Sequence, residues 1–291
     1  MMDYRARFLV DPLKKLTLAD IDPNDTGDID KEDATEITAK YLQRMEEDQF
    51  LLYADGRQSL LVVLQALDAA GKDGVIRHVF SAMNPQGTRV HGFKQPTPCE
   101  AAHDFLWRVH AEVPAAGEVV IFNRSHYEDV LVVRVHDLVP REIWSQRYEK
   151  INAFERLLAE NGTRVLKFFL HISPEEQLER FKKRLDDPKR HWKISESDYS
   201  ERKFWPQYIE AYEEALVKTS TLTAPWYVIP ANHKWFRNLA VSQIISETLD
   251  EMGLELPPTR VNIDEIKVHY HAAVKAANGN GNGNGNGKKT T

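Results

Sequence analysis

The stretch 60–76 constrains the fold of this 291-residue chain more than any other part of it. It opens with the apolar run LLVVL, which is typical of a strand buried on both faces of a parallel sheet. A turn with Gly71, Lys72 and Gly74 follows, and a helix is predicted from about Val75. Free N–H groups at the start of a helix, together with a lysine ammonium, bind phosphate. The stretch therefore predicts a phosphate-binding loop.

This loop departs from the common pattern G-x-x-x-x-G-K-[ST] at two positions. Ala66 replaces the first glycine, and Asp73 replaces the hydroxyl residue that usually binds a metal ion. Asp68 would repel a phosphate unless a divalent cation lay between them, so we expect Asp68 to hold Mg²⁺ directly or through water. The alternatives are a loop-capping role for Asp68 and, for the Gly-Lys pair alone, an ordinary polar turn.

Composition excludes several classes of protein. A hydrophobic content of 42% is enough for a sizeable core, and a net charge of −6 argues against binding nucleic acid or anionic membranes through the whole surface. Cys99 is the only cysteine, which excludes an intrachain disulfide. No apolar run approaches the roughly 18 residues of a membrane helix, and the first residues lack a secretory signal. We expect a cytoplasmic protein with no membrane or nucleic-acid partner and a local polyanion site.

Composition and periodicity divide the chain into four segments. These are an N-terminal helical extension (1–56), a phosphate-loop domain (57–250) with a helical lid at about 174–217, a C-terminal arm (251–277) and a disordered Asn/Gly tail (278–291). The extension contains a predicted helix at 31–55 with an inner face formed by Ile37, Tyr41, Met45 and Leu51. The arm is expected to pack on the body or on a neighbouring subunit.

Alternation of strands and helices predicts an α/β fold. Buried or short strands are predicted at 60–64, 88–93, 119–122, 165–172 and 226–230. Capping boxes predict one helix that begins at Thr97 and ends at about Val113, and a second helix that begins at Ser173. The second of these has an expected apolar side of Leu178, Phe181 and Leu185, and a further helix is predicted at about 196–217. The pattern indicates a parallel five-stranded sheet flanked by helices.

A polar cluster follows the strand at 119–122, at the sheet edge where open α/β sheets bind ligands. Asn123 stands where phosphate-loop proteins usually have an aspartate that orients Mg²⁺, and its amide oxygen can accept from a metal-bound water. Arg124 offers a planar fork to phosphate oxygens, and an ion pair with Glu128 or Asp129 is the alternative. His126 is expected to be a hydrogen-bonding histidine rather than an acid or base.

A third cluster places six cations within the predicted lid, namely Lys182, Lys183, Arg184, Lys189, Arg190 and Lys193. They are expected to close over a charged substrate, and a solvated helix face is the alternative. Lys94 and Arg108 lie where a phosphate-loop kinase binds its acceptor nucleotide. The alternative for both is a plain surface charge, which for Arg108 would form an ion pair with Asp104, one helical turn before it.

Together these residues resemble the polyphosphate kinase 2 family over about residues 35–250. The resemblance is carried by the variant loop ALDAAGKDG at 66–74, GFKQPT at 92–97, HDFLWR at 103–108, FNRSHY at 122–127 and the lid stretch 184–193 followed by Trp205 and Tyr208. It implies a P-loop kinase fold similar to thymidylate kinase. It also implies transfer of the terminal phosphoryl group of inorganic polyphosphate to nucleoside mono- and diphosphates, or the reverse, which forms nucleoside triphosphates in one direction. Magnesium is the expected ion, with manganese as the alternative, and the assembly is expected to be a homo-oligomer, a dimer or a tetramer.

Residues and resemblance together define the candidate site. Its catalytic residues are Asp68, Lys72, Asn123 and Arg124, of which Asp68 and Asn123 are the candidate metal ligands. Its candidate polyphosphate-binding residues are Ala70, Gly71, Lys72, Asp73, Gly74, Arg184, Lys189, Arg190 and Lys193. Its candidate nucleotide-binding residues are Lys94, Asp104, Arg108 and Glu128. Two other functions remain open: a nucleoside-phosphate kinase that uses ATP, and a nucleotide- or polyanion-sensing module without turnover.

Overall fold

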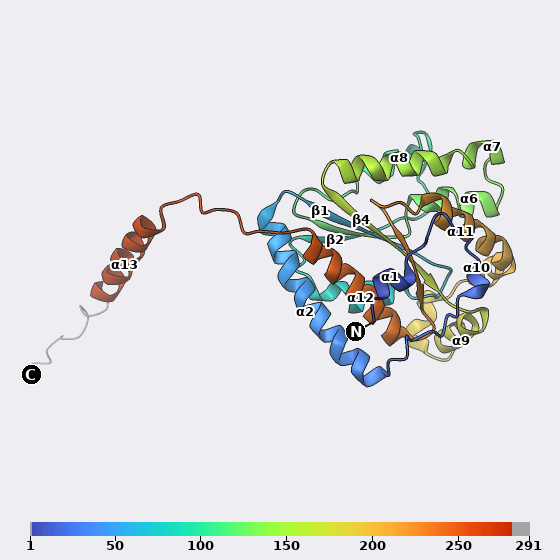
Figure 1. Cartoon of the computed structure of the whole chain (residues 1–291), viewed down its shortest axis with the longest axis horizontal. Coiled ribbons are helices and arrows are strands. Elements are labelled where there is room, and N and C mark those ends of the chain that lie inside the picture. Colours follow the sequence, from blue (N-terminus) through green and yellow to red (C-terminus); the bar gives the residue numbers. More distant parts are fainter. Residues whose placement is uncertain (1, 281–291) are drawn as a thin grey trace, which may run out of the picture. The chain divides into compact units, whose positions relative to one another are not determined.

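A parallel sheet forms the centre of the chain in the computed structural model, which describes residues 2–280 (Figure 1). Its five strands within the described residues are β1 Ser59–Gln65, β2 Thr88–Gly92, β3 Val119–Asn123, β4 Thr163–His171 and β5 Trp226–Pro230. They are arranged in the order β2-β3-β1-β4-β5, and each neighbouring pair is parallel. The predicted five-stranded parallel sheet is therefore confirmed.

Strand β1 is buried along its whole length because helices cover both faces of the sheet. Leu60, Val62 and Leu64 face the core shared with α1 (Tyr4–Phe8), α2 (Lys31–Asp55), α3 (Lys72–His78) and α12 (Lys234–Glu251). Leu61 and Val63 face the core shared with α8 (Arg147–Glu160) and α11 (Trp205–Thr219). A strand buried in this way has no polar face, which explains the continuous apolar run in its sequence.

The register of the sheet brings the two predicted phosphate-binding segments together. Leu64 of β1 pairs with Asn123, the last residue of β3. The backbone N–H of Arg124 donates to the carbonyl of Leu64 at 3.1 Å, so the loops that leave β1 and β3 start side by side. The carboxyl edge of the sheet thus carries both polar clusters.

The helix predicted at 31–55 is confirmed, and one residue of its expected inner face differs. Helix α2 begins after Asp30, whose side chain accepts from two backbone N–H groups, and ends at Gly56 in the left-handed conformation. Its buried side includes Tyr41 and Met45 as predicted, but Leu52 is buried in place of Leu51.

The long helix predicted after Thr97 is wrong. The capping box forms, yet it starts only α4 (Pro98–Ala101), and a separate helix α5 (Trp107–His110) follows. Between them the side chain of Asp104 accepts from the backbone N–H of Leu106 at 3.0 Å. This local bond competes with a helical path for the backbone, and the helix is interrupted.

The predicted lid at about 174–217 comprises α9 (Pro174–Leu185), a 3₁₀ segment (Pro188–Lys193), α10 (Glu196–Glu201), a 3₁₀ turn (Arg202–Phe204) and α11. The single helix predicted at about 196–217 is wrong, because the 3₁₀ turn divides it into α10 and α11. Ser173 caps α9, but the Glu176 carboxylate contacts Arg180, so the expected capping box is only half formed. Phe181 is buried as predicted. Leu178 and Leu185 are instead exposed, because the inner side of α9 carries polar groups that face the phosphate loop.

Two short helices, α6 (Val132–Val135) and α7 (Arg141–Trp144), connect β3 to α8.

The N-terminal segment lies against β5, which is an edge strand of the sheet. Leu9 forms an antiparallel bridge with Tyr227, and the backbone N–H of Val10 donates to the carbonyl of Trp226 at 2.9 Å.

The described residues from Leu256 to Asn280 form a separate unit, which contains α13 (Ile263–Asn280). This helix reaches three residues into the Asn/Gly segment, and the rest of that expected disordered tail lies outside the described residues. Packing of the C-terminal arm on the body stays a prediction. In the part of the chain that the structure describes, each helix is too short or too polar to cross a bilayer.

Candidate active site

The phosphate loop joins the end of β1 to the start of α3 in six residues. The helix begins at Lys72, three residues earlier than predicted, and Gly71 precedes it with φ of +109°. This conformation is unfavourable for residues with a Cβ atom, which explains a glycine here. The first N–H groups of α3 are therefore those of the Lys-Asp-Gly segment itself.

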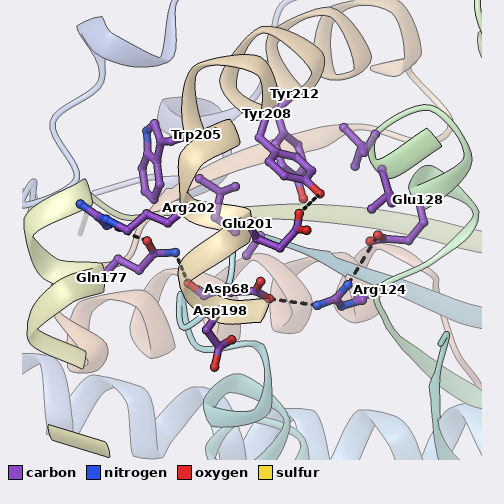
Figure 2. A pocket seen from close by; sticks show the side chains of 14 residues that line it. Asp68, Arg124, Glu128, Gln177, Asp198, Glu201, Arg202, Trp205, Tyr208 and Tyr212 are labelled. Atoms are coloured by element: carbon purple, nitrogen blue, oxygen red, sulfur yellow. Dashed lines mark hydrogen bonds and ion pairs between the residues drawn. The ribbon is translucent and has the colours of Figure 1, made fainter. Parts of the chain in front are cut away.

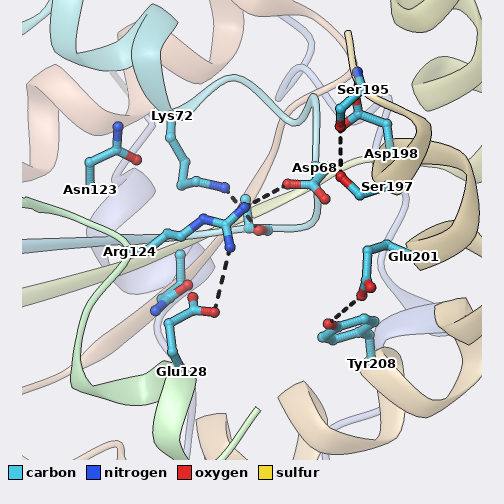
Figure 3. A network of polar contacts seen from close by, with 12 residues as sticks. Asp68, Lys72, Asn123, Arg124, Glu128, Ser195, Ser197, Asp198, Glu201 and Tyr208 are labelled. Carbon is cyan, nitrogen blue, oxygen red and sulfur yellow. Dashed lines mark hydrogen bonds and ion pairs between the residues drawn. The ribbon is translucent and has the colours of Figure 1, made fainter. Parts of the chain in front are cut away.

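Lys72 lies across this loop (Figure 3). Its ammonium donates to the carbonyl of Ala66 at 3.0 Å. Burial lowers the pKa of Lys72, and the nearby guanidinium of Arg124 lowers it further. A bound phosphate would oppose both effects and favour the charged form.

Arg124 bridges the two loops, and it does so from a left-handed backbone conformation with φ of +62°. Its guanidinium donates to Asp68 at 2.9 Å and lies 3.7 Å from Glu128. The ion pair with Glu128 that was the alternative for Arg124 therefore exists. Asp129 instead pairs with Arg147 at 3.0 Å, and its pKa is raised to about 6 by burial, which Arg147 opposes only in part.

Asp73 connects the loop to the lid. Its carboxylate accepts from the amide of Asn123 at 3.1 Å and from Lys193 at 3.3 Å. Burial would raise the pKa of Asp73, but these two contacts lower it overall. Three of the predicted site residues thus meet in a single chain of polar contacts.

A cavity of about 1270 Å³ opens between the phosphate loop and the lid. The predicted site residues that line it are Asp68, Gly71, Lys72, Asp73, Gly74, Asn123, Arg124, Arg184, Lys189, Arg190 and Lys193. Lys183 lines it as well, whereas Lys182 points elsewhere and pairs with Asp186. Ala70 is buried beside it, and its carbonyl accepts from Arg180. We refer to this space as the basic cavity.

Sequence reasoning missed several cations of the basic cavity, namely Lys31, Arg77, Arg180, Lys234 and Arg237. Lys234 and Arg237 belong to the first turns of α12, which follows the carboxyl end of β5. That position was the available signal, because ligands of parallel sheets bind beyond the carboxyl ends of the strands.

A second pocket of about 40 Å³ adjoins the first. It is lined on one side by Asp68, Arg124 and Glu128 (Figure 2). The other side is formed by side chains of α10 and α11 and the turn between them, including Glu201, Arg202, Trp205, Tyr208 and Tyr212. The two spaces share Asp68, Arg124 and Asp198 in their linings. We refer to this space as the aromatic pocket.

Three of the predicted nucleotide-binding residues line neither space. Arg108 donates to the carbonyl of Lys94 at 2.8 Å and lies over the ring of Phe93. Within the described residues its acidic neighbour is Glu100, at 3.9 Å, so the alternative ion pair with Asp104 is wrong. Glu128 is the one member of that set that reaches the aromatic pocket.

His126 is a buried hydrogen-bonding histidine, as expected. Its Nε2 lies 3.2 Å from Glu155, and burial lowers the pKa of the ring. Glu155 also accepts from Tyr127 at 2.8 Å and pairs with Lys167. The segment that carries Arg124 is therefore anchored in the core by a charged network.

The described residues contain no group of three or more His, Cys, Asp or Glu side chains that could hold a metal ion. The phosphate loop nevertheless presents two carboxylates, Asp68 and Asp73, to the basic cavity. No described group donates a hydrogen bond to the side-chain oxygen of Asn123. Because Mg²⁺ prefers oxygen ligands and retains several waters, this donor set fits it.

We expect Gly71→Ala to abolish phosphate binding at the loop. An added Cβ would lie 2.1 Å from Nη1 of Arg237, in a backbone conformation that strains any residue but glycine by about 1–3 kcal/mol. Gly56→Ala is the matched control, because Gly56 has φ of +62° but nothing within 4 Å of its added Cβ. Melting temperature and phosphate affinity are measured for both. Normal affinity in the Gly71 variant would contradict the close packing.

Comparison with known proteins gives a consistent assignment. The model of the family described as Polyphosphate kinase 2 (PPK2) matches residues 28–257. An AMP/ADP-polyphosphate phosphotransferase of Meiothermus ruber is 51% identical over 264 residues, which are 90% of this chain and 99% of that protein. An ADP-polyphosphate phosphotransferase of Rhodopseudomonas palustris is 45% identical over 79% of this chain and 83% of that protein. The crystal structure of Polyphosphate Kinase 2 from Arthrobacter aurescens TC1 superposes with a TM-score of 0.90 at 41% identity, covering 93% of this chain and 97% of that one.

Proposed function

The chain belongs to the polyphosphate kinase 2 family, and from that premise we propose that it transfers the terminal phosphoryl group of inorganic polyphosphate to AMP and ADP. The reverse transfers follow from reversibility. The observation that carries the proposal is the basic cavity, which gathers lid cations over a phosphate loop in a chain of net charge −6. Such a local concentration of positive charge attracts a polyanion that the rest of the surface repels.

We place the transfer point where the basic cavity meets the aromatic pocket. Asp68 and Arg124 line both spaces, and Lys72 lies beside them. Polyphosphate in the basic cavity and the acceptor phosphate at the aromatic pocket would then approach the Arg124 guanidinium from two sides. Phosphoryl transfer needs such in-line placement and charge neutralisation, with little covalent help, so we propose direct transfer without a phosphoenzyme.

The nucleotide is assigned to the aromatic pocket because its wall combines ring faces with hydrogen-bonding groups. Trp205, Tyr208 and Tyr212 supply the rings, and Glu128 lies opposite them. The pocket volume is only about 40 Å³, and we propose that α10 and α11 shift away from the phosphate loop when a nucleotide enters. Lys94, Asp104 and Arg108 stay proposals for more distant nucleotide contacts.

Asp68 and Asn123 are the proposed ligands of Mg²⁺, with Mn²⁺ as the alternative ion. When bound, the ion would neutralise charge on the reacting phosphates. The ion pair with Arg124 holds the Asp68 carboxylate at the proposed transfer point. Homo-oligomers are also proposed, and gel filtration with light scattering measures the assembly.

One assay tests the function directly. Purified protein is incubated with Mg²⁺, linear polyphosphate and AMP or ADP, without ATP, and formation of ADP and ATP is followed. We expect ADP from AMP and ATP from ADP. Absence of both products would reject the proposal, and turnover of AMP with ATP but not with polyphosphate would favour an ordinary nucleoside-phosphate kinase. Polyphosphate binding without any transfer would favour a sensing module.

A further inference from the structure

Two buried arginines lie beside the phosphate loop, and they have very different partners. Arg180 is 6% exposed and pairs with Glu176 at 2.7 Å. Its guanidinium also donates to backbone carbonyls on both sides of it, those of Ala69, Ala70, Ala231 and Asn232. The charge of Arg180 is therefore compensated by a carboxylate, and its hydrogen bonds connect the phosphate loop to the segment after β5.

Arg237 is more deeply buried, at 1% exposure, and lacks such compensation. Within the described residues no carboxylate forms an ion pair with it, and its side-chain hydrogen bonds both go to Oδ1 of Asn238, at 2.8 and 3.2 Å. Burial and repulsion from Arg180 lower the pKa of Arg237 to about 9. The pKa of Lys234 nearby is lowered by burial and by these same two arginines.

The guanidinium of Arg237 is packed directly against the phosphate loop. A Cβ added to Gly71 would lie 2.1 Å from its Nη1, and one added to Gly74 would lie 3.0 Å from its Nη2. Arg237 is also among the residues that line the basic cavity. Its charge therefore lies behind the turn of backbone that is expected to receive phosphate.

Burying a cation without a counter-charge opposes folding, and replacing such a group with an uncharged one of similar volume is often neutral or stabilising. The fold itself therefore gives no reason to keep a charge at this position. An anion in the adjoining cavity does, because it supplies the missing counter-charge in a site of low dielectric, where the attraction is strong. Arg180 differs, because the Glu176 carboxylate within the fold already compensates its charge. The need for an external anion therefore applies to Arg237 and not to Arg180.

We propose that Arg237 is a positioning residue for polyphosphate, whose uncompensated charge draws the phosphate chain into the loop from behind. Bound polyphosphate in turn supplies the counter-charge that Arg237 lacks within the described part of the protein. This inference rests on the proposed function, because it takes the anion in the basic cavity to be polyphosphate. It assigns to α12 a part in substrate binding in addition to those of the loop and the lid.

The test compares Arg237→Gln with Arg237→Lys, which keeps the charge, and with Arg180→Gln. Thermal unfolding is measured with and without linear polyphosphate, together with KM for polyphosphate and kcat. We expect Arg237→Gln to melt at or above the wild-type temperature without ligand, to lose most of the polyphosphate-induced rise in Tm, and to raise KM about tenfold. Arg237→Lys should keep part of the rise, whereas Arg180→Gln should melt lower without ligand.

The inference would be overturned if polyphosphate raised the Tm of Arg237→Gln as much as it raises that of the wild-type protein and the KM for polyphosphate were unchanged. Arg237→Met provides a second neutral substitution that fills the space with apolar atoms. Failure of both neutral variants to fold without polyphosphate would overturn it too, because it requires the charge to be dispensable for folding. The proposed function fails separately, if the wild-type protein forms no ADP or ATP from polyphosphate.

Discussion

Replacement of Lys72 by alanine is expected to lower polyphosphate-dependent formation of ADP by roughly 10²- to 10³-fold. The ammonium lies at the proposed transfer point and is held there by the carbonyl of Ala66. Charge that develops on the transferring phosphoryl group would lose a fixed, partly desolvated cation. The fold should tolerate the change, because the side chain is only partly buried and the carbonyl that it leaves can bind water.

Initial rates of ADP formation from AMP, measured at saturating polyphosphate, check this expectation, and circular dichroism checks the fold. Lys182→Ala is the matched control, since this lid lysine pairs with Asp186 and does not line the basic cavity. Its rate should stay within about twofold of the wild-type rate, because an exposed ion pair contributes little. Equal rates for the wild-type and Lys72→Ala proteins would remove the phosphate loop from the mechanism.

Replacement of Lys167 by methionine should lower the free energy of unfolding by about 3–5 kcal/mol, because it leaves the Glu155 carboxylate buried without its cation. Both side chains are fully buried. Lys167 also donates to Tyr127 at 2.9 Å and to the carbonyl of Thr219 at 2.7 Å. The variant therefore breaks a network that joins β4, α8, the end of α11 and the segment after β3. Urea unfolding at pH 7 measures the loss.

The pH dependence distinguishes this cause from a simple packing defect. In the wild-type protein burial would raise the pKa of Glu155, but Lys167 and His126 lower it overall. Its contribution to stability is thus present above the ordinary glutamate pKa and is lost as the pH falls through the lowered value. Without Lys167, burial should raise the pKa of Glu155, so protonation relieves the strain and the deficit should shrink towards pH 5. A deficit that is constant with pH would contradict this explanation.

A double variant, Glu155→Gln with Lys167→Met, serves as the control for the charge itself. It removes both ions while keeping similar volumes, and it should recover much of the stability lost in the single variant. The remaining deficit would measure the lost hydrogen bonds that Lys167 donates to the Tyr127 hydroxyl and the Thr219 carbonyl. No recovery would mean that packing, rather than the unpaired carboxylate, is responsible.

Most of the sheet could be predicted because the local sequence of each strand is enough to identify it. The apolar runs in β1, β3 and β5 reflect burial on two faces, which is a property of each segment alone. Helix interruptions were harder to predict. The side-chain bond of Asp104 and the exposure of Leu178 and Leu185 depend on which groups lie opposite, and periodicity contains no such information.

The candidate site divides in the same way. The phosphate loop and the lid cations form compact sequence motifs, and the basic cavity brings them together. Arg180 and Arg237 come from two distant helices and look like ordinary surface charges in the sequence. Only the fold reveals that both are buried beside Gly71 and that, among the residues that the structure describes, Arg237 has no carboxylate partner.

The N-terminal segment has a consequence for handling the protein. An edge strand in a sheet presents a row of unsatisfied N–H and C=O groups, which template pairing with other chains. Here Leu9 and Val10 satisfy part of that row on β5, and the hydroxyl of Ser220 fixes the segment by donating to the Val10 carbonyl at 2.9 Å. Removal of these residues, or displacement of the segment by a purification tag, would expose the edge of β5. We expect such a protein to aggregate in storage even if its phosphate chemistry is unchanged.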